Sequence, residues 1–531
     1  MGLYLNPSNK LFQRSLDARF YVDKTELATF LNKRMGQADG LVCVSRPRRF
    51  GKSVDADMLA AYYSRGAESR AQFEGLYVSR SSSFDEHLNK HDVIKLVMTQ
   101  MIALAEGPDG IPAAVTEEVL AEVRETWPQA VPESTKSLPK ALALVEAQKG
   151  TGFVFIIDEW DCIMREAENA ESAQRAYLDF LRDLLKDRSY VEACYMTGIL
   201  PIRKYGQHSA LNLFREYSMA TPDELAHLMG FNADEVERLC ERLGRDFSEM
   251  ERWYDGYVLG EKRIHVYNPN SVARSLSSGR CSSYWTQTET YEALQRYIDI
   301  DFDGVGTDLV AMLDGAKVPA DISNFENSMT DFKSKDDVYA LLVHLGYLGH
   351  DEEARSVFIP NEEIRREFAG SLKTGARPQL ARLIGESREL QQRTLEGDET
   401  YVADAIQRAH ASAAGPRYYN DEQALRAAVK LAYIWSIDDY LRVDELPGGR
   451  GYADVAYIPK TGSSLPPLVI ELKWNKPADA AIEQITRRNY PAALRELTGE
   501  CVLVGITYDE KTTQHSCKIE RVRLGGKGDA R

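Results

Sequence analysis

The 531-residue sequence lacks several features that would place it in a specialised class of protein. No apolar stretch approaches the roughly 18 residues that a membrane-spanning helix needs. The N-terminus has no basic segment followed by an apolar one, so it does not resemble a signal peptide. The seven cysteines are scattered singly, without the paired spacing of zinc sites or the density of a disulfide framework. We therefore expect a cytoplasmic protein with reduced thiols and no membrane association.

The sequence also lacks an excess of positive charge, because its formal net charge is -16. A protein that coats nucleic acid without specificity concentrates lysine and arginine, so this composition argues against that role. Any contact with phosphate must depend on local basic patches. The two candidate patches are Arg46 with Arg48 and Arg49, and Arg487 with Arg488. The acidic balance is compatible with an enzyme whose carboxylates hold a divalent metal ion.

A single hydrophobic core does not extend over a chain of this length, so we expect three or four domains. From residue 41 to residue 200, short apolar runs alternate with longer amphipathic stretches, which predicts an α/β fold with a parallel sheet. The middle of the chain is helical in pattern and includes a helix, a short hairpin and a helix that resemble a winged-helix module. The predicted domains are 1–204 (P-loop-type ATPase), 205–300 (helical lid), 301–375 (winged-helix-like module) and 376–531 (α/β domain).

A strand, a short loop and a helix are predicted around the string LVCVSRPRRFGKSVDADML. That context makes its GKS triplet a phosphate-loop candidate. Lys52 would reach the β and γ phosphates of ATP, Ser53 would place its hydroxyl on Mg²⁺, and backbone amides would cradle the phosphates. The sequence departs from GxxxxGK[S/T] at the first position, where Arg46 replaces glycine. The predicted nucleotide-binding residues of this loop are Arg49, Phe50, Gly51, Lys52 and Ser53.

Acidic residues follow the buried-strand run FVFII, at Asp158 and Glu159. In a phosphate-loop enzyme, Asp158 would order Mg²⁺ and Glu159 would polarise the attacking water. Strands often end in acidic residues only because the next turn is solvated, but the position of this pair after GKS favours the functional interpretation. The strand EACYMTG ends in Thr197, which is a candidate γ-phosphate sensor or, equally, an ordinary strand-end threonine. Arg203 follows on the same rim.

The last part of the chain contains an ordered set of polar residues: Glu422 on a predicted helix, Asp454 on a strand, Glu471 and Lys473 on the next strand, and Gln484 on the following helix. Residues i and i+2 of a strand share a face, so Glu471 and Lys473 project together and Asp454 can meet them. An ExK triplet alone is more often the exposed end of an edge strand. The combination with the other three residues favours a site.

Two carboxylates and a backbone carbonyl offer the hard oxygen ligands that Mg²⁺ or Mn²⁺ prefers. The metal would lower the pKa of a bound water, and Lys473 would hold or activate the nucleophile. The predicted metal ligands are Ser53 and Asp158 in the ATPase and Asp454 and Glu471 in the C-terminal domain. The predicted catalytic residues are Glu159 in the ATPase and Glu422, Asp454, Glu471, Lys473 and Gln484 in the C-terminal domain.

These residues, with the strings YVDKTEL, RPRRFGKS, IIDEWD, MTGI, WYDGY, VYNPNS and IELKW, resemble a bacterial family of AAA-ATPase-like proteins fused to a PD-(D/E)xK nuclease domain. The resemblance covers nearly the whole chain in the right order. It implies that Arg46 is normal at its position, because the family's phosphate loop reads RPRRFGK. It also implies a restriction-endonuclease-like fold for residues 376–531.

The leading hypothesis is an ATP-binding and ATP-hydrolysing protein whose nucleotide state controls a Mg²⁺-dependent nuclease acting on DNA, with RNA less favoured. Such an architecture suits defence against foreign DNA or the maintenance of mobile elements. A homo-oligomer is plausible, since ATPases of this type often complete their sites with an arginine from a neighbour. The alternative is a nucleotide-switched regulatory or scaffold protein whose C-terminal domain binds without cutting. The presence of Asp454, Glu471 and Lys473 together argues against that alternative.

Overall fold

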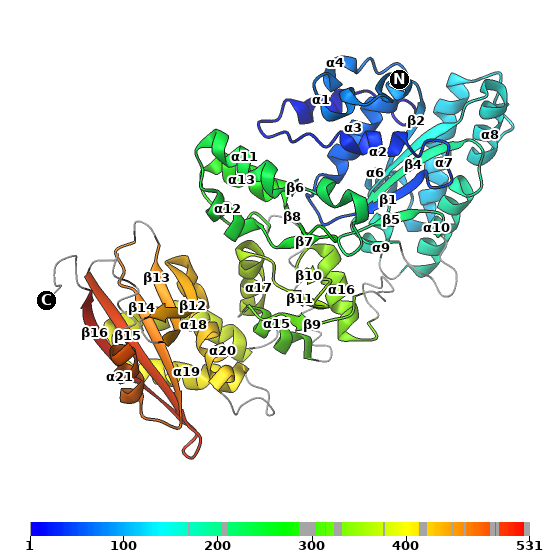
Figure 1. The fold of residues 1–531 in the computed structure, drawn as a ribbon. Coiled ribbons are helices and arrows are strands. Elements are labelled where there is room, and N and C mark those ends of the chain that lie inside the picture. The colour runs from blue at the N-terminus through cyan, green and yellow to red at the C-terminus, as the bar shows by residue number, and fades with distance from the viewer. Residues whose placement is uncertain are drawn as a thin grey trace. The chain divides into compact units, whose positions relative to one another are not determined.

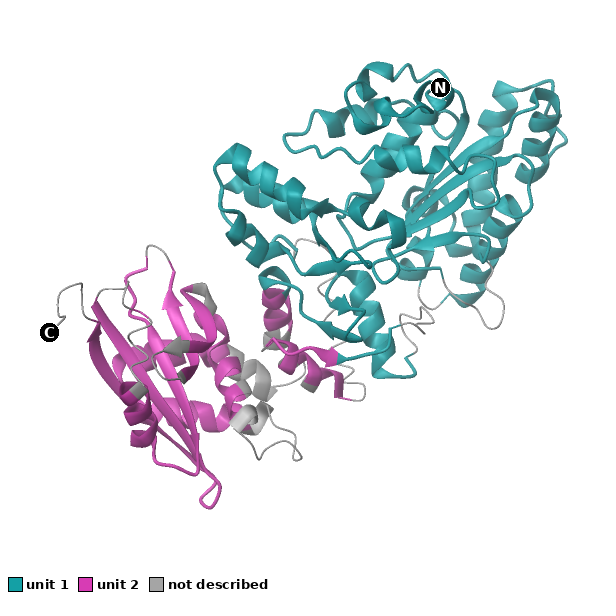
Figure 2. Ribbon diagram, viewed as in Figure 1, with its two compact units in different colours: residues 1–285, 319–364 teal, residues 286–318, 365–531 magenta. Residues whose placement is uncertain are grey.

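The computed structural model describes residues 2–167, 170–202, 211–285, 304–313, 315–322, 332–374, 378–413, 422–448, 451–460, 463–488, 494 and 499–524. The chain separates into two compact units, residues 1–285 with 319–364 (unit 1) and residues 286–318 with 365–531 (unit 2), as Figure 2 shows. The finer division into four domains stays a prediction. None of the helices in the described ranges is both long enough and apolar enough to span a membrane.

Unit 1 is built on a five-stranded sheet in the order β2-β3-β4-β1-β5. Its neighbouring strands all pair in parallel. The strands are β1 (Leu41–Ser45), β2 (Asp92–Val97), β3 (Phe153–Asp158), β4 (Val191–Gly198) and β5 (Arg215–Tyr217). Every residue of β3 is buried, as expected for a parallel strand covered by helices on both faces. The parallel α/β fold predicted for the N-terminal part is therefore confirmed.

Two helices precede the first strand of this sheet, and the others lie between its strands along the chain. In Figure 1, α1–α4 lie along one side of the sheet and α7, α8 and α10 along the other. They are α1 (Lys10–Leu16), α2 (Glu26–Asn32), α3 (Lys52–Tyr63), α4 (Arg70–Phe73), α5 (Phe84–His87), α6 (Met98–Leu104), α7 (Ile111–Thr126), α8 (Leu138–Lys149), α9 (Cys162–Glu166) and α10 (Glu171–Leu185). Because the strands are parallel, the loops that follow β1, β3 and β4 all lie at one edge of the sheet.

A second, mainly helical part of unit 1 follows β5. It contains η3 (Asp223–Leu228), α11 (Ala233–Leu243), α12 (Phe247–Tyr254) and α13 (Pro269–Ser278), and a small antiparallel sheet, β6 (Phe231–Asn232), β8 (Ile264–Tyr267) and β7 (Tyr257–Leu259). Asn232 and Glu235 form a capping box at the start of α11, which satisfies backbone donors that the first turn leaves open. Apolar residues including Val236, Trp253 and Tyr267 form its core.

The described part of unit 1 ends with a helix and a hairpin, α16 (Lys335–Leu345), β10 (Gly349–Asp351) and β11 (Ser356–Phe358), and α17 (Glu362–Thr374) begins directly after them. The two strands pair antiparallel. Helix, hairpin and helix therefore occur in the predicted order. Their identification as a winged helix stays a prediction.

Unit 2 contains a mixed five-stranded sheet in the order β12-β13-β14-β15-β16. Only β14 and β15 pair in parallel, and α21 makes the crossover that a parallel pair requires. The strands are β12 (Tyr440–Gly448), β13 (Gly451–Pro459), β14 (Leu468–Trp474), β15 (Gly499–Asp509) and β16 (Gln514–Leu524). The helices are α15 (Val305–Leu313), α18 (Pro378–Glu396), α19 (Glu399–Ala413), α20 (Glu422–Ala432) and α21 (Ala478–Arg488), with the short η5 (Ile434–Asp438).

Candidate functional site

The loop between β1 and α3 holds the GKS residues at the carboxyl edge of the parallel sheet. Gly51 has φ 87° and Arg49 has φ 66°, both in the left-handed region that glycine adopts at least cost. A Cβ added to Gly51 would meet nothing within 4 Å, so the backbone conformation, and not lack of space, requires glycine there. Left-handed residues in a turn aim successive N–H groups inward, which forms an anion-binding concavity.

Lys52 begins α3 with a buried side chain. Its Nζ donates to the carbonyl oxygens of Arg46 at 3.0 Å and Pro47 at 2.8 Å, so the lysine folds back over the loop. Burial and the nearby Arg46 lower the pKa of Lys52 to about 8, against the opposing charges of Asp161 and Asp158. If a phosphate binds here, the Lys52 ammonium exchanges its two neutral carbonyl acceptors for a negatively charged one.

Asp158 and Thr197 lie side by side on β3 and β4, and Thr197 also pairs with Val44 of β1. Both side chains are buried. Asp158 Oδ1 and Thr197 Oγ1 have no hydrogen-bond partner among the described residues. Burial raises the pKa of Asp158, although a hydrogen bond with Ser53 and the charge of Lys52 act in the opposite direction. The structure therefore brings together Ser53, Asp158 and Thr197, and their roles toward nucleotide stay a prediction.

Glu159 follows Asp158 in a left-handed conformation, with φ 55°. Its Oε2 lies 3.7 Å from Arg165 Nη2, and the same guanidinium lies 3.3 Å from Asp161 Oδ2. Asp161 accepts hydrogen bonds from the backbone amides of Ile199 at 3.0 Å and Leu200 at 2.8 Å. Asp161 thus fixes the chain after β4, and Arg165 restrains the candidate catalytic carboxylate.

The loop's own side chains divide by burial. Arg46, Pro47 and Phe50 are buried, whereas Arg49 is exposed. The Phe50 ring meets Tyr257 edge-on, with centroids 5.6 Å apart and planes at 86°. Of the atoms of Phe50, only those of the backbone are therefore placed to bind a nucleotide. The contact between this loop and Tyr257 was not predicted from the sequence. The predicted rim residue Arg203 lies outside the described residues.

In unit 2, Asp454 of β13 and Glu471 of β14 are exposed by 9% and 2%. Asp454 Oδ2 accepts a hydrogen bond from the backbone amide of Leu472 at 2.8 Å, so its carboxylate lies against the strand that carries Glu471. Glu471 Oε1 accepts from Lys473 Nζ at 2.8 Å and from Gln484 Nε2 of α21. The structure thus brings four of the five predicted C-terminal residues together.

The fifth predicted residue, Glu422, begins α20, and its side chain lies outside the described part of the structure. The same helix supplies a residue that sequence reasoning missed, because Arg426 forms an ion pair with Asp454 and lies 3.3 Å from Glu445. The described residues contain no cluster of three or more His, Cys, Asp or Glu side chains able to hold a metal ion. A metal here would rely on Asp454, Glu471 and backbone oxygen.

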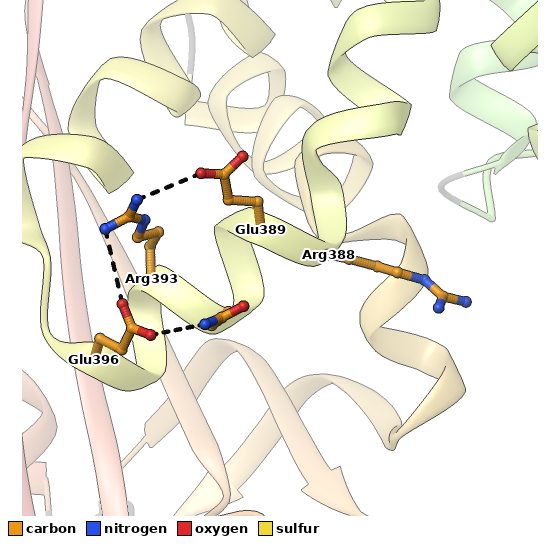
Figure 3. A pocket seen from close by; sticks show the side chains of 5 residues that line it. Arg388, Glu389, Arg393 and Glu396 are labelled. Carbon is orange, nitrogen blue, oxygen red and sulfur yellow. Dashed lines mark hydrogen bonds and ion pairs between the residues drawn. The ribbon is translucent and has the colours of Figure 1, made fainter.

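A shallow pocket of unit 2 does not coincide with either group. It has a volume of about 560 Å³ and is lined by Arg388, Glu389, Gln392, Arg393 and Glu396, all on α18 (Figure 3). Arg393 lies 3.6 Å from Glu389 and 3.9 Å from Glu396, and Gln392 donates to Glu396 at 2.8 Å. These side chains form ion pairs and a hydrogen bond within one helix, which indicates a solvated helix face.

Comparison with known proteins bears on the N-terminal part. Residues 12–207 match the family model described as predicted AAA-ATPase. The similarity to this family is confined to that part of the chain. The match contains the GKS loop, Asp158 at the end of β3, the following Glu159, and Thr197. It ends well before the C-terminal carboxylates, so the nuclease interpretation of those residues has no support from it.

Other similarities are weaker. The chain is 26% identical over 290 residues to an uncharacterized protein in the vnfD 5′ region of Azotobacter chroococcum mcd 1, and it spans about half of that relative's length (52% of each chain). Among solved structures, the Walker-type ATPase of Pyrococcus abyssi is 12% identical with a TM-score of 0.34 over 65% of this chain and 96% of that one. The Aeropyrum pernix ORC2 protein is 11% identical with a TM-score of 0.23 over 66% and 93%.

Proposed function

We propose that unit 1 binds and hydrolyses Mg²⁺-ATP at the carboxyl edge of its parallel sheet. The observation that carries this proposal is the convergence of the GKS loop with two buried oxygen atoms that have no described partner, Asp158 Oδ1 and Thr197 Oγ1. Ser53 and Asp158 would hold the Mg²⁺, which neutralises phosphate charge when bound. Lys52 binds the phosphates, Glu159 orients and deprotonates the attacking water, and Thr197 contacts the γ phosphate.

The test of this activity is ATP turnover by the full chain. Glu159→Gln should lower the turnover rate by about 100- to 10,000-fold, because it removes the general base. Lys52→Ala should lower it by roughly 100- to 1,000-fold, because it removes a charged donor to the transition state. Glu171→Gln, at an exposed position of α10, is the matched control and should turn over ATP normally. Equal turnover in all four proteins would contradict the proposal.

We further propose that unit 2 is a Mg²⁺- or Mn²⁺-dependent nuclease of the PD-(D/E)xK kind that acts on DNA, with RNA as the less favoured substrate, and that ATP controls it. The support is the arrangement of Asp454, Glu471, Lys473 and Gln484 on β13, β14 and α21. Asp454 and Glu471 would hold the metal, which activates water when bound. Lys473, already beside Glu471, holds the nucleophile, and Gln484 orients Glu471.

Cleavage of circular DNA, linear DNA and RNA should be measured with Mg²⁺ or Mn²⁺, with and without ATP. We expect metal-dependent cutting of DNA that disappears in Lys473→Ala and changes with ATP. Lys476→Ala is a suitable control, since this lysine lies three residues further along, outside the predicted set. Cutting that survives in Lys473→Ala, or that needs no metal, would contradict the assignment.

One observation favours a second candidate, a nucleotide-switched scaffold that binds nucleic acid or a partner without cutting it. The candidate carboxylates already have donors within the protein: Arg426 for Asp454, and Lys473 with Gln484 for Glu471. Such an arrangement can be purely structural. Mn²⁺ binding distinguishes the two, because a nuclease must bind the ion at Asp454 and Glu471, and a scaffold need not.

A further inference from the structure

Arg46 occupies the position at which the general phosphate-loop pattern has glycine. It is not among the described residues with positive φ, so its backbone does not need glycine's freedom. Its amide donates to the carbonyl of Gly198 at the end of β4 at 3.0 Å, and its carbonyl accepts from Lys52. The side chain is 2% exposed. Arg46 is therefore built into the interior and is not an arginine that reaches out to solvent.

The guanidinium of Arg46 spans the phosphate loop from its first residue to the helix beyond it. It forms an ion pair with Asp55, which is also buried. Asp55 lies in the first turn of α3, where its amide donates to the carbonyl of Gly51 at 3.0 Å. The pair thus connects the first residue of the loop, Arg46, to the first turn of the helix that follows it. A buried charge without its partner is strongly unfavourable, so each side chain constrains the position of the other.

Two further contacts fix the direction of this guanidinium. Nη1 donates to the carbonyl of Leu228, the last residue of η3, at 2.9 Å, and Nη2 lies 3.4 Å from the Tyr195 hydroxyl of β4. A planar guanidinium can meet several acceptors at once in a rigid geometry that a lysine cannot reproduce. Phe50, four residues further along the loop, packs against Tyr257. The loop is therefore held by side-chain contacts with α3, η3, β4 and Tyr257.

We infer that Arg46 is the positioning residue of the phosphate loop: through Asp55 and the Leu228 carbonyl it holds the loop in its phosphate-binding shape. The inference rests on the proposed binding of ATP by unit 1. Arg46 contacts neither phosphate nor metal in this role. A buried ion pair here replaces the close backbone packing that a first glycine allows in the general pattern.

The decisive variant is Arg46→Gly, which restores the general GxxxxGK[S/T] pattern. If position 46 only needs a residue that leaves room for the loop, the glycine variant should bind ATP as well as the wild type. We expect instead that its dissociation constant for ATP, measured by titration calorimetry, rises by roughly tenfold or more, because misplacement of binding groups by about 1 Å has effects of that size or larger. Arg46→Lys should lie between the two.

Loss of folding must be separated from loss of positioning. Arg46→Gly with Asp55→Ala removes both buried charges, and we expect a folded protein whose ATP affinity is still roughly tenfold lower. Lys149→Ala is the matched control, since it removes a partner of the buried Asp92 where β2 begins, at the opposite edge of the sheet. Its ATP affinity should equal that of the wild type.

The outcomes separate the inference from the proposed function. Wild-type affinity in the double variant would overturn the role of Arg46 and leave ATP binding intact. An equal loss in Lys149→Ala would also overturn it, because the effect would then be general destabilisation. A wild-type protein that binds no ATP would overturn the proposed function itself.

Discussion

The two candidate sites differ in how their buried polar groups are balanced. In unit 1, Asp158 and Thr197 each have a buried oxygen atom without a described hydrogen-bond partner. In unit 2, Asp454 is ion-paired with Arg426 and Glu471 with Lys473. Buried polar atoms in native proteins are nearly always hydrogen-bonded, so orphaned oxygens on neighbouring strand ends, next to a loop with left-handed residues, favour a ligand site. The site of unit 1 therefore holds buried oxygen atoms that a ligand would satisfy, and the carboxylates of unit 2 differ from Asp158 in that each has a cationic partner.

The difference follows from where each site is built. The residues of unit 1 come from the carboxyl ends of parallel strands and from the loop and helix that follow β1, which is the edge where ligands bind in sheets of this kind. The residues of unit 2 come from the bodies of β13 and β14 and from helices packed on them, so cationic side chains reach the carboxylates directly. A metal ion bound as proposed in unit 2 would share Asp454 with Arg426, whereas Asp158 of unit 1 forms no ion pair with the residues that the structure describes.

The sharpest test of this comparison is metal binding by unit 2, which is measured by titrating the full chain with Mn²⁺. Asp454→Ala with Glu471→Ala should weaken Mn²⁺ binding by at least about 100-fold, since losing outer-shell partners alone costs about 10- to 100-fold. Arg426→Ala should change affinity in the opposite direction and tighten Mn²⁺ binding several-fold, because it removes the cation that competes for Asp454.

Lys430→Ala is the matched control for Arg426→Ala. Lys430 lies one helical turn further along α20 and pairs with Asp444 at 3.1 Å, not with Asp454. It should leave Mn²⁺ affinity unchanged. Weaker binding in Arg426→Ala would show that this arginine orients Asp454 and does not compete with the metal, and the contrast between the two sites would then fail.

A second prediction concerns the pH dependence of ATP binding in unit 1. Burial lowers the pKa of Lys52 to about 8, and contact with phosphate raises the pKa again in the complex. Below the pKa of the free protein, Lys52 is already charged and affinity is constant. Above it, binding requires uptake of a proton, so the dissociation constant should rise by about tenfold per pH unit.

The measurement is titration calorimetry of ATP between pH 7 and pH 9.5, repeated in buffers of different ionisation enthalpy to count the protons taken up. Lys52→Arg provides the control, because a guanidinium stays charged throughout this range. Its affinity, whatever its value, should be independent of pH. A flat profile in the wild type would show that Lys52 is fully charged before nucleotide binds.

Sequence periodicity predicted the positions of residues that share a strand or a strand end. Glu471 and Lys473 share a face of β14, as their i, i+2 spacing indicates, and they lie in contact. Asp158 and Thr197 end apolar runs that become neighbouring parallel strands. In each case the local pattern determines on which face of the strand the side chain lies, and the regular pairing of strands brings the side chains together.

Contacts between distant elements could not be predicted in this way. Nothing in the spacing of α20 indicates that Arg426 reaches β13, and nothing near RPRRF indicates that Arg46 meets Leu228, 182 residues further along. The strands of the small sheet in unit 1 have two to four residues each, too few to show alternation. Such features depend on packing, which a single sequence does not display.

The smallest predicted effect is that of replacing a left-handed glycine by alanine, at Gly51 of the phosphate loop and at Gly150 as its control. Gly51 and Gly150 both adopt φ in the left-handed region, at 87° and 73°, and a Cβ at either would meet nothing within 4 Å. Each change to alanine should therefore cost about 1–2 kcal/mol through the backbone alone and lower the midpoint of thermal unfolding by a few degrees.

Gly150 ends α8, before the strand β3 and away from its carboxyl end, so Gly150→Ala should bind ATP normally. Gly51→Ala should in addition weaken ATP binding, because relaxing φ turns the loop amides away from the phosphates. Equal ATP affinity in both variants would mean that the left-handed turn serves folding only, and the site of unit 1 would then be no more dependent on its backbone than that of unit 2.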